Sequence, residues 1–280
     1  MKQYIIIRNN FALLISFCLI AIVGCDEQKR VIEPFIPAGN RIVLLEEFTG
    51  KGCTNCPKGS REIENLLTLF PNNLVAVSIH AGFFANPQFF PIGQYDFRTE
   101  EGEILFDYLG PNLGYPSGVV NRIPISGNMQ IGANAWASAI SNEIQKAPAI
   151  ELTIIKSFDP VSRALTVTVG GIAKEPVAGN IQLSIMLTES GVIDAQDDAE
   201  ATPHIVPDYE HKHLLRDMMT PVHGAPILTS ISTGQTFSET FSVTLDPSWV
   251  AENMEIIAFV SRVEGSDFPV LQVVSAHVTE

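Results

Sequence analysis

The chain has 280 residues, of which 46% are hydrophobic and 17% charged, so it has enough apolar material for folded cores and too little charge for a disordered chain. With 31 acidic and 17 basic residues, its formal net charge is −14. We expect no nucleic-acid partner, because binding a phosphate backbone needs clustered Lys and Arg. The four cysteines are too few for a disulfide-dense mini-scaffold.

Residues 1–24 have the pattern of an export signal. Lys2 and Arg8 precede an apolar run of 13 residues, 11–23, which is shorter than the roughly 20 residues that a transmembrane helix needs. The run stops at Gly24-Cys25 and resembles the bacterial lipobox, in which the signal is cut before the cysteine and that cysteine is acylated. We therefore predict a lipoprotein signal peptide over 1–24 and a lipid on Cys25 as the membrane anchor. The alternative is an ordinary signal peptide that contains a cysteine.

The next segments predict a tether and then an α/β domain. Residues 25–40 hold two prolines and a glycine, which is typical of a linker. Over 41–148, buried apolar runs alternate with helix-spaced apolar residues, as in an α/β layer fold. The expected strands are 42–45, 74–79 and 119–120, and the expected helices are 63–70, 99–109 and 136–144. Thr99 can cap the second helix.

After residue 148 the hydrophobic pattern changes to period two, which predicts an all-β domain over 149–280 with an immunoglobulin-like sandwich. The six expected strands are 150–154, 165–169, 181–187, 237–245, 256–260 and 270–274. The polar, His-rich segment of about 194–226 is expected to be a long loop held by its histidines. The alternative is a metal cluster that includes His211 and His213, which would share one face of a strand.

The motif that carries chemistry lies between the first strand and the first helix. Cys53 and Cys56 form a CxxC in which Cys53 is expected at the helix N-terminus, where the helix dipole favours a thiolate. Cys56 is then placed to resolve a mixed disulfide. A c-type haem is excluded because Pro57 stands where that motif needs His, and zinc is disfavoured because there is no second CxxC. We expect no metal and no cofactor.

With this motif the segment resembles the thioredoxin superfamily. The resemblance implies that Glu47, six positions before Cys53, lies behind the active site and relays protons. It also implies that Tyr115-Pro116-Ser117 is a cis-proline loop facing the disulfide, with Pro116 shaping the groove and Tyr115 and Ser117 binding substrate. The alternatives are a solvated carboxylate at Glu47 and an ordinary trans turn at Pro116. Gly52 stands where the best-known members have Trp, and the dipeptide Thr54-Asn55 differs from their Gly-Pro.

A closer resemblance covers nearly the whole chain after the signal. The runs 43–50, 53–59 and 114–122 look like the lipoproteins related to the 28-kDa outer membrane protein. That family joins a thioredoxin-like domain to a β-sandwich, and its Tyr-x-His-x-His-x-x-Arg element is similar to residues 209–216. The resemblance implies an outer membrane location.

These observations favour a membrane-anchored envelope lipoprotein that exchanges thiols and disulfides with another protein. The alternative is a surface binding or assembly protein in which the CxxC is only a structural disulfide. The aromatic region 83–97 is either a substrate-binding wall beside the CxxC or an insertion with its own small core.

The role expected for Glu47 depends on which face of its strand the side chain occupies. If the side chain is buried behind the disulfide, burial raises its pKa and lets it exchange a proton with Cys56. Adjacent strand residues point to opposite faces, so only one of Glu46 and Glu47 can face Cys56.

Overall fold

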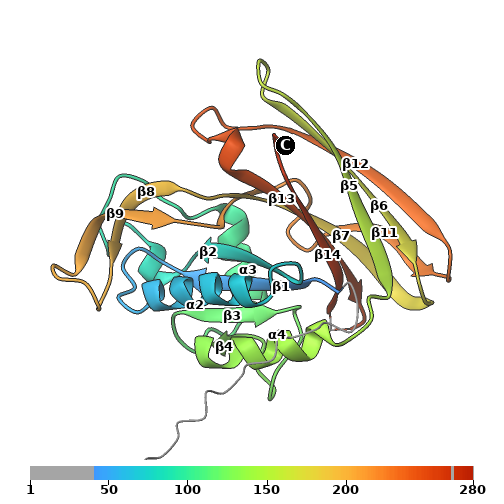
Figure 1. Ribbon diagram of the computed structural model, residues 1–280, viewed down its shortest axis with the longest axis horizontal. Coiled ribbons are helices and arrows are strands. Elements are labelled where there is room, and N and C mark those ends of the chain that lie inside the picture. The colour runs from blue at the N-terminus through green and yellow to red at the C-terminus, as the bar shows by residue number, and fades with distance from the viewer. Residues whose placement is uncertain (1–40, 266–267, 280) are drawn as a thin grey trace, which may run out of the picture. The chain divides into compact units, whose positions relative to one another are not determined.

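The structure is a computed structural model that describes residues 41–265 and 268–279 (Figure 1). These residues belong to one compact unit. The predicted signal peptide, the tether and Cys25 lie outside them. None of the helices in the described ranges is long and apolar enough to cross a membrane.

Residues 41–148 form the three strands and three helices that the periodicity predicts, and one further short strand. The strands are β1 (Val43–Thr49), β2 (Leu74–His80), β3 (Ser117–Val120) and β4 (Ile131–Gly132), and the helices are α2 (Cys56–Leu69), α3 (Glu100–Tyr108) and α4 (Trp136–Ile144). Short 3₁₀ turns occur at η1 (Phe83–Ala85) and η2 (Ala133–Ala135). The Thr99 hydroxyl caps α3 as predicted, accepting a hydrogen bond from the Gly102 amide at 2.9 Å.

The remaining residues are almost entirely strands. They are β5 (Ile150–Asp159), β6 (Ala164–Ala173), β7 (Val177–Glu189), β8 (Val192–Asp197), β9 (Ile205–His211), β10 (Leu214–Met218), β11 (Ala225–Ile231), β12 (Thr236–Thr244), β13 (Met254–Val263) and β14 (Val270–His277), with a 3₁₀ turn η3 (Ala251–Asn253) before β13. The six predicted strands are present. The long loop expected at 194–226 is wrong, because this segment contributes to β8 and β11 and includes β9 and β10. Its polar composition hid the strands, since the buried face of β8 carries the polar side chains of Asp194 and Gln196, which bond to the CxxC loop.

One sheet runs through both halves of the chain. Its order is β14-β13-β7-β10-β2-β1-β3-β4, and β11 also pairs with β7. β1 is parallel to β2 and antiparallel to β3. β10 joins the halves, because it pairs with β7 and, through Leu214 and Ser78, with β2. The predicted domain boundary after residue 148 falls between α4 and β5 and stays a prediction.

The outer part of this sheet separates two apolar cores. In β7, Ile185 and Leu187 pack into one core, whereas Met186 packs into the other. β13 alternates in the same way, which explains why both strands contain uninterrupted apolar runs. The first core lies against β6 of the three-stranded sheet β12-β6-β5, and the second lies against α3 and β1. The protein is therefore mostly β, with two sheets packed around an apolar core in its C-terminal half.

Candidate functional site

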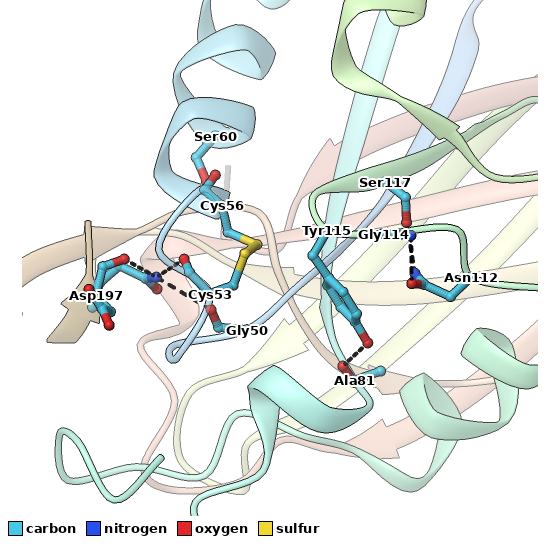
Figure 2. The surroundings of a disulfide bond; sticks show 11 residues. Gly50, Cys53, Cys56, Ser60, Ala81, Asn112, Gly114, Tyr115, Ser117 and Asp197 are labelled. Carbon is cyan, nitrogen blue, oxygen red and sulfur yellow. Dashed lines mark hydrogen bonds between the residues drawn. A yellow bond between two sulfur atoms is a disulfide. The ribbon is translucent and has the colours of Figure 1, made fainter. Parts of the chain in front are cut away.

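Cys53 and Cys56 form a disulfide at the start of α2 (Figure 2). Cys56 is the first residue of the helix, and its amide donates a hydrogen bond to the Cys53 carbonyl at 3.1 Å. Cys53 therefore lies in the turn before the helix, and Pro57 occupies the first helical turn, where a missing N–H is tolerated. Cys53 is 3% exposed and Cys56 is 1% exposed, so the disulfide is almost completely covered.

Glu47 is buried on the face of β1 that α2 covers. Its side chain is 0% exposed, its Oε2 accepts a hydrogen bond from the Ser78 hydroxyl at 2.9 Å, and its Oε1 has no partner among the described residues. Burial raises the pKa of Glu47 to about 7, and the Ser78 hydrogen bond opposes this only in part. Glu47 is thus a buried carboxyl group, as expected, and not a solvated one.

Gly59 in α2 brings Glu47 and the proline loop together. A Cβ at this position would lie 2.7 Å from Glu47 Oε1 and 2.8 Å from Pro116 Cβ, so only glycine lets the helix approach both. The Tyr115–Pro116 peptide bond is cis. The helix that carries Cys56, the carboxyl group and the proline therefore meet at one point.

Hydrogen bonds hold the residues on either side of Pro116. The Tyr115 hydroxyl donates to the Ala81 carbonyl at 3.0 Å, and Figure 2 shows the Tyr115 side chain close to the disulfide. Ser117 is buried, and its hydroxyl donates to Gln130 Oε1 at 2.8 Å. Ser117 thus holds the loop from within, while Tyr115 is half-buried beside the cysteines.

Glu46 has the opposite environment. Its two oxygens accept hydrogen bonds from Nε and Nη2 of Arg122 at 2.9 and 2.7 Å, and both side chains are fully buried. The Arg122 guanidinium also lies over the Phe259 ring, 4.8 Å from its centroid. Glu46 is therefore part of a structural ion pair, and Glu47 is the carboxyl group that α2 covers.

The two-stranded arm β8–β9 holds the CxxC loop from the other half of the chain. The Gln196 side-chain amide donates to the carbonyls of Cys53, Gly50 and Asp197 at 3.2, 3.3 and 2.9 Å. Two amides of the same segment donate to the loop, Asp197 to the Lys51 carbonyl and Ala199 to the Thr54 carbonyl, both at 2.9 Å.

A buried ion pair between Lys51 and Asp194, at 2.9 Å, joins the arm to the loop at a further point. None of these partners stands out in the sequence, because Gln196 lies 143 positions after Cys53 and belongs to no motif.

The histidines do not form the metal cluster considered above. His211 is the last residue of β9 and packs against His80 and Phe97, with ring centroids 5.5 and 4.8 Å apart. His213 lies beyond the strand with φ of 54° and interacts with Glu64 at 3.2 Å, so the expectation that both histidines share one strand face is wrong. No group of three or more His, Cys, Asp or Glu side chains in the described part of the chain is arranged to hold a metal ion.

A cavity of about 240 Å³ lies between α2, the ends of β1 and β2, and β9. Its lining includes Ser78, which is bonded to Glu47, and the buried His80 and His211. Burial lowers the pKa of His211 to about 4 and the pKa of His80 well below its ordinary value, so both rings are neutral near pH 7. Within the described protein, His80 Nδ1 and His211 Nε2 have no hydrogen-bond partner.

Aromatic rings line the side of the site next to the proline loop. We call this set the aromatic cluster, and it consists of Phe83, Phe84, Phe89, Phe90 and Tyr115. The centroids of rings that contact each other in this cluster lie 4.8 to 5.3 Å apart. Of the two readings of the aromatic region, this contact with Tyr115 favours a wall beside the CxxC over an isolated insertion.

More than half of the chain matches a known protein family. The family model of outer membrane protein Omp28 matches residues 107–280. The chain belongs to the Omp28 family. The resemblance seen in the sequence motifs is thereby confirmed, and membership of this outer membrane protein family places the chain in the cell envelope. No curated protein matches the chain.

Solved structures support the fold. HBP35 of Porphyromonas gingivalis is 18% identical, with a TM-score of 0.65 over 88% of this chain and 77% of that chain. A protein of Agrobacterium tumefaciens is 10% identical, with a TM-score of 0.51 over 85% of this chain and 95% of that chain. A domain of the outer membrane lipoprotein Omp28 of P. gingivalis is 20% identical, with a TM-score of 0.32 over 47% of this chain and 88% of its own length. At these identities, the first two similarities show a shared fold and not a shared activity.

Proposed function

We propose that this Omp28-family protein is a lipid-anchored envelope protein whose CxxC exchanges thiols and disulfides with protein substrates. In this proposal, residues 41–148 form a thioredoxin-like domain and 149–280 an immunoglobulin-like sandwich. The order strand, CxxC helix, parallel strand, helix, proline loop and antiparallel strand supports the first assignment. The two packed sheets of the C-terminal half support the second.

The observation that carries the proposal is the convergence at Gly59. The helix bearing Cys56 packs there against a buried carboxyl group with a pKa near 7 and against Pro116. A structural disulfide has no use for such a carboxyl group, whereas proton transfer at neutral pH needs one, because a general acid–base group works best when its pKa is near the working pH.

The exchange has two steps. In the reduced protein, the Cys53 thiolate attacks a substrate disulfide, so that a mixed disulfide forms and one substrate thiolate leaves. Glu47 then takes the proton of the Cys56 thiol, and Cys56 attacks the Cys53 sulfur. The second substrate thiolate leaves, and the two electrons have passed from the protein to the substrate. The reverse sequence, starting from the disulfide form of the protein, oxidises a substrate dithiol.

The cavity beside Ser78 supports this role for Glu47. A buried carboxyl group can act repeatedly only if it regains or loses its proton between turnovers. Ser78 contacts both Glu47 and the cavity, so the cavity offers a route by which Glu47 can equilibrate with solvent.

A second function is favoured by the burial of the cysteines. With 3% and 1% exposure, and with the arm holding the loop, the disulfide could instead be a structural staple of a surface binding or assembly protein. The two functions differ in how readily the disulfide is reduced.

The deciding measurement is the reduction potential of the purified protein, from equilibration with thiol buffers. We expect a value above about −300 mV, because structural disulfides typically lie below it. A value well below that figure would assign the disulfide to structure and end the exchange proposal. In a separate kinetic assay of single-turnover exchange with a disulfide substrate, Glu47→Gln should slow the resolution of the mixed disulfide by about 10²- to 10⁴-fold, the usual contribution of a general acid–base group.

A further inference from the structure

Phe90 occupies the space beside Cys53 that a side chain at position 52 would fill. A Cβ added to Gly52 would lie 2.0 Å from Cγ of the Phe90 ring. The Gly52 amide also donates a hydrogen bond to the Phe84 carbonyl at 2.9 Å. An aromatic surface next to the first cysteine is therefore supplied by a segment far along the chain and not by the CxxC loop itself.

The aromatic cluster joins both sides of the site. Phe90 touches Gly52, which precedes Cys53, while Phe84 lies 5.3 Å from Tyr115, which precedes Pro116. Two outer members extend into solvent, since Phe83 is 54% exposed and Phe89 is 58% exposed. Large adjacent apolar side chains left in water are a common mark of a binding surface.

Carboxylates flank this surface. Glu103 accepts hydrogen bonds from the Gly82 amide at 3.1 and 3.3 Å, directly before Phe83. The first turn of α3 carries Glu100, Glu101 and Glu103. The nearby Arg98 is paired with Asp96 at 2.7 Å. Together with a net charge of −14, this flank attracts cationic partners and repels acidic ones.

We propose that the aromatic cluster selects the substrate: a disulfide-bonded protein segment with an aromatic or aliphatic residue beside its cysteine and a Lys or Arg close by. The inference rests on the proposed exchange function and assigns it a substrate class. The apolar side chain packs on Phe83 and Phe89 while the substrate sulfur meets Cys53, and the basic side chain faces Glu103.

The test uses the reduced protein and three disulfide-linked peptide dimers. The residues beside the cysteine are Phe and Lys, Ser and Lys, or Phe and Glu. The rate at which the protein reduces each peptide is divided by the rate at which dithiothreitol reduces the same peptide. This ratio corrects for the effect of the neighbouring residues on the reactivity of the peptide's own cysteine. Bis(2-hydroxyethyl) disulfide serves as a small substrate, because it carries neither an apolar side chain to pack on the rings nor a basic one to face Glu103.

We expect the Phe/Lys peptide to react fastest. The Ser/Lys peptide should be roughly two- to tenfold slower, from the usual strength of an aromatic contact. The Phe/Glu peptide should also be slower, and that difference should shrink as salt is added. Phe83→Ser and Phe89→Ser should abolish the preference for Phe. Ile155→Ser, which removes a 72% exposed side chain from β5, should keep the preference.

The outcomes distinguish a failure of the proposed substrate class from a failure of the exchange function. Equal rates for the three peptides, or an unchanged preference in Phe83→Ser and Phe89→Ser, overturn the substrate class while leaving exchange intact. No reaction with any disulfide, the small one included, overturns both the exchange function and the inference drawn from it.

Discussion

Glu46 and Glu47 are neighbours in β1 with different roles. Successive side chains of a strand point to opposite faces, so one carboxylate meets Arg122 and the other meets Ser78 and α2. The sequence predicts that only one of them can face Cys56. It does not reveal that the other is locked in a buried ion pair, because Arg122 is 76 positions away.

Burial of Glu47 makes stability depend on pH. Below about pH 4.5, its ordinary pKa, the carboxyl group is protonated in both the folded and the unfolded protein. Between there and its folded pKa of about 7 it ionises only when unfolded, so the free energy of unfolding falls as pH rises. The total loss is about 3 kcal/mol.

Glu47→Gln removes this titration. Relative to the wild type, the variant should therefore gain about 3 kcal/mol of stability between pH 4 and pH 8. Urea unfolding of both oxidised proteins at the two pH values measures this gain. Glu252→Gln, at an exposed position, is the control and should follow the wild type. A stability difference that does not change with pH would mean that Glu47 titrates normally in the folded protein.

Glu46→Gln should instead lower the free energy of unfolding. It leaves the fully buried Arg122 without its charged partner, which typically costs about 3–5 kcal/mol. Chemical unfolding at pH 7 measures the loss, and the double variant Glu46→Leu with Arg122→Met should recover much of it. If the single variant is as stable as the wild type, the ion pair contributes little. Glu46→Gln is consequently a poor neutral control for kinetic tests of Glu47.

Among the structural elements, the β8–β9 arm was the least predictable. The periodicity of β5, β6 and β12 is visible because one face of each strand alternates with a more exposed face. In β8 the buried side chains include Asp194 and Gln196, so hydrophobicity gives no signal. These polar side chains are buried because they satisfy the carbonyls and the lysine of the CxxC loop.

Gln196→Ala tests the hold of the arm on the loop. The substitution leaves the carbonyls of Cys53 and Gly50 without this donor and should cost about 1–3 kcal/mol. The backbone amides of residues 50–56 should exchange their hydrogens faster than in the wild type, and this increase should be larger than that in the sheet β12-β6-β5. Gln145→Ala, at an exposed position directly after α4, should change stability by less than about 0.5 kcal/mol. Unchanged exchange in the loop would show that the arm does not order it.

At the scale of the whole molecule, we predict that membrane anchoring depends on one residue. If Cys25 carries the lipid, Cys25→Ser should move the protein from the membrane to soluble fractions, because a 13-residue apolar run is too short to span. Fractionation with a carbonate wash, followed by immunoblotting, measures the distribution. Persistence of the variant in the washed pellet would contradict the lipobox interpretation.

The sequence by itself determined the local structure and the motif chemistry. The CxxC before a helix, the Thr99 cap and the period-two strands depend on residues close together in the chain, so their patterns can be read directly. Family membership also followed from motifs that are short and contiguous.

Only the tertiary structure decided how the site is enclosed. The clamp of Gln196 on Cys53, the pair of Glu46 with Arg122 and the contact of Phe90 with Gly52 join segments distant in sequence. Each depends on which strands pair and in what register. β10 joins the two halves through Leu214 and Ser78, and local periodicity carries no information about that partner. Sheet pairing thus set the burial of the disulfide and the raised pKa of Glu47, because both arise from side chains that the folded chain brings together.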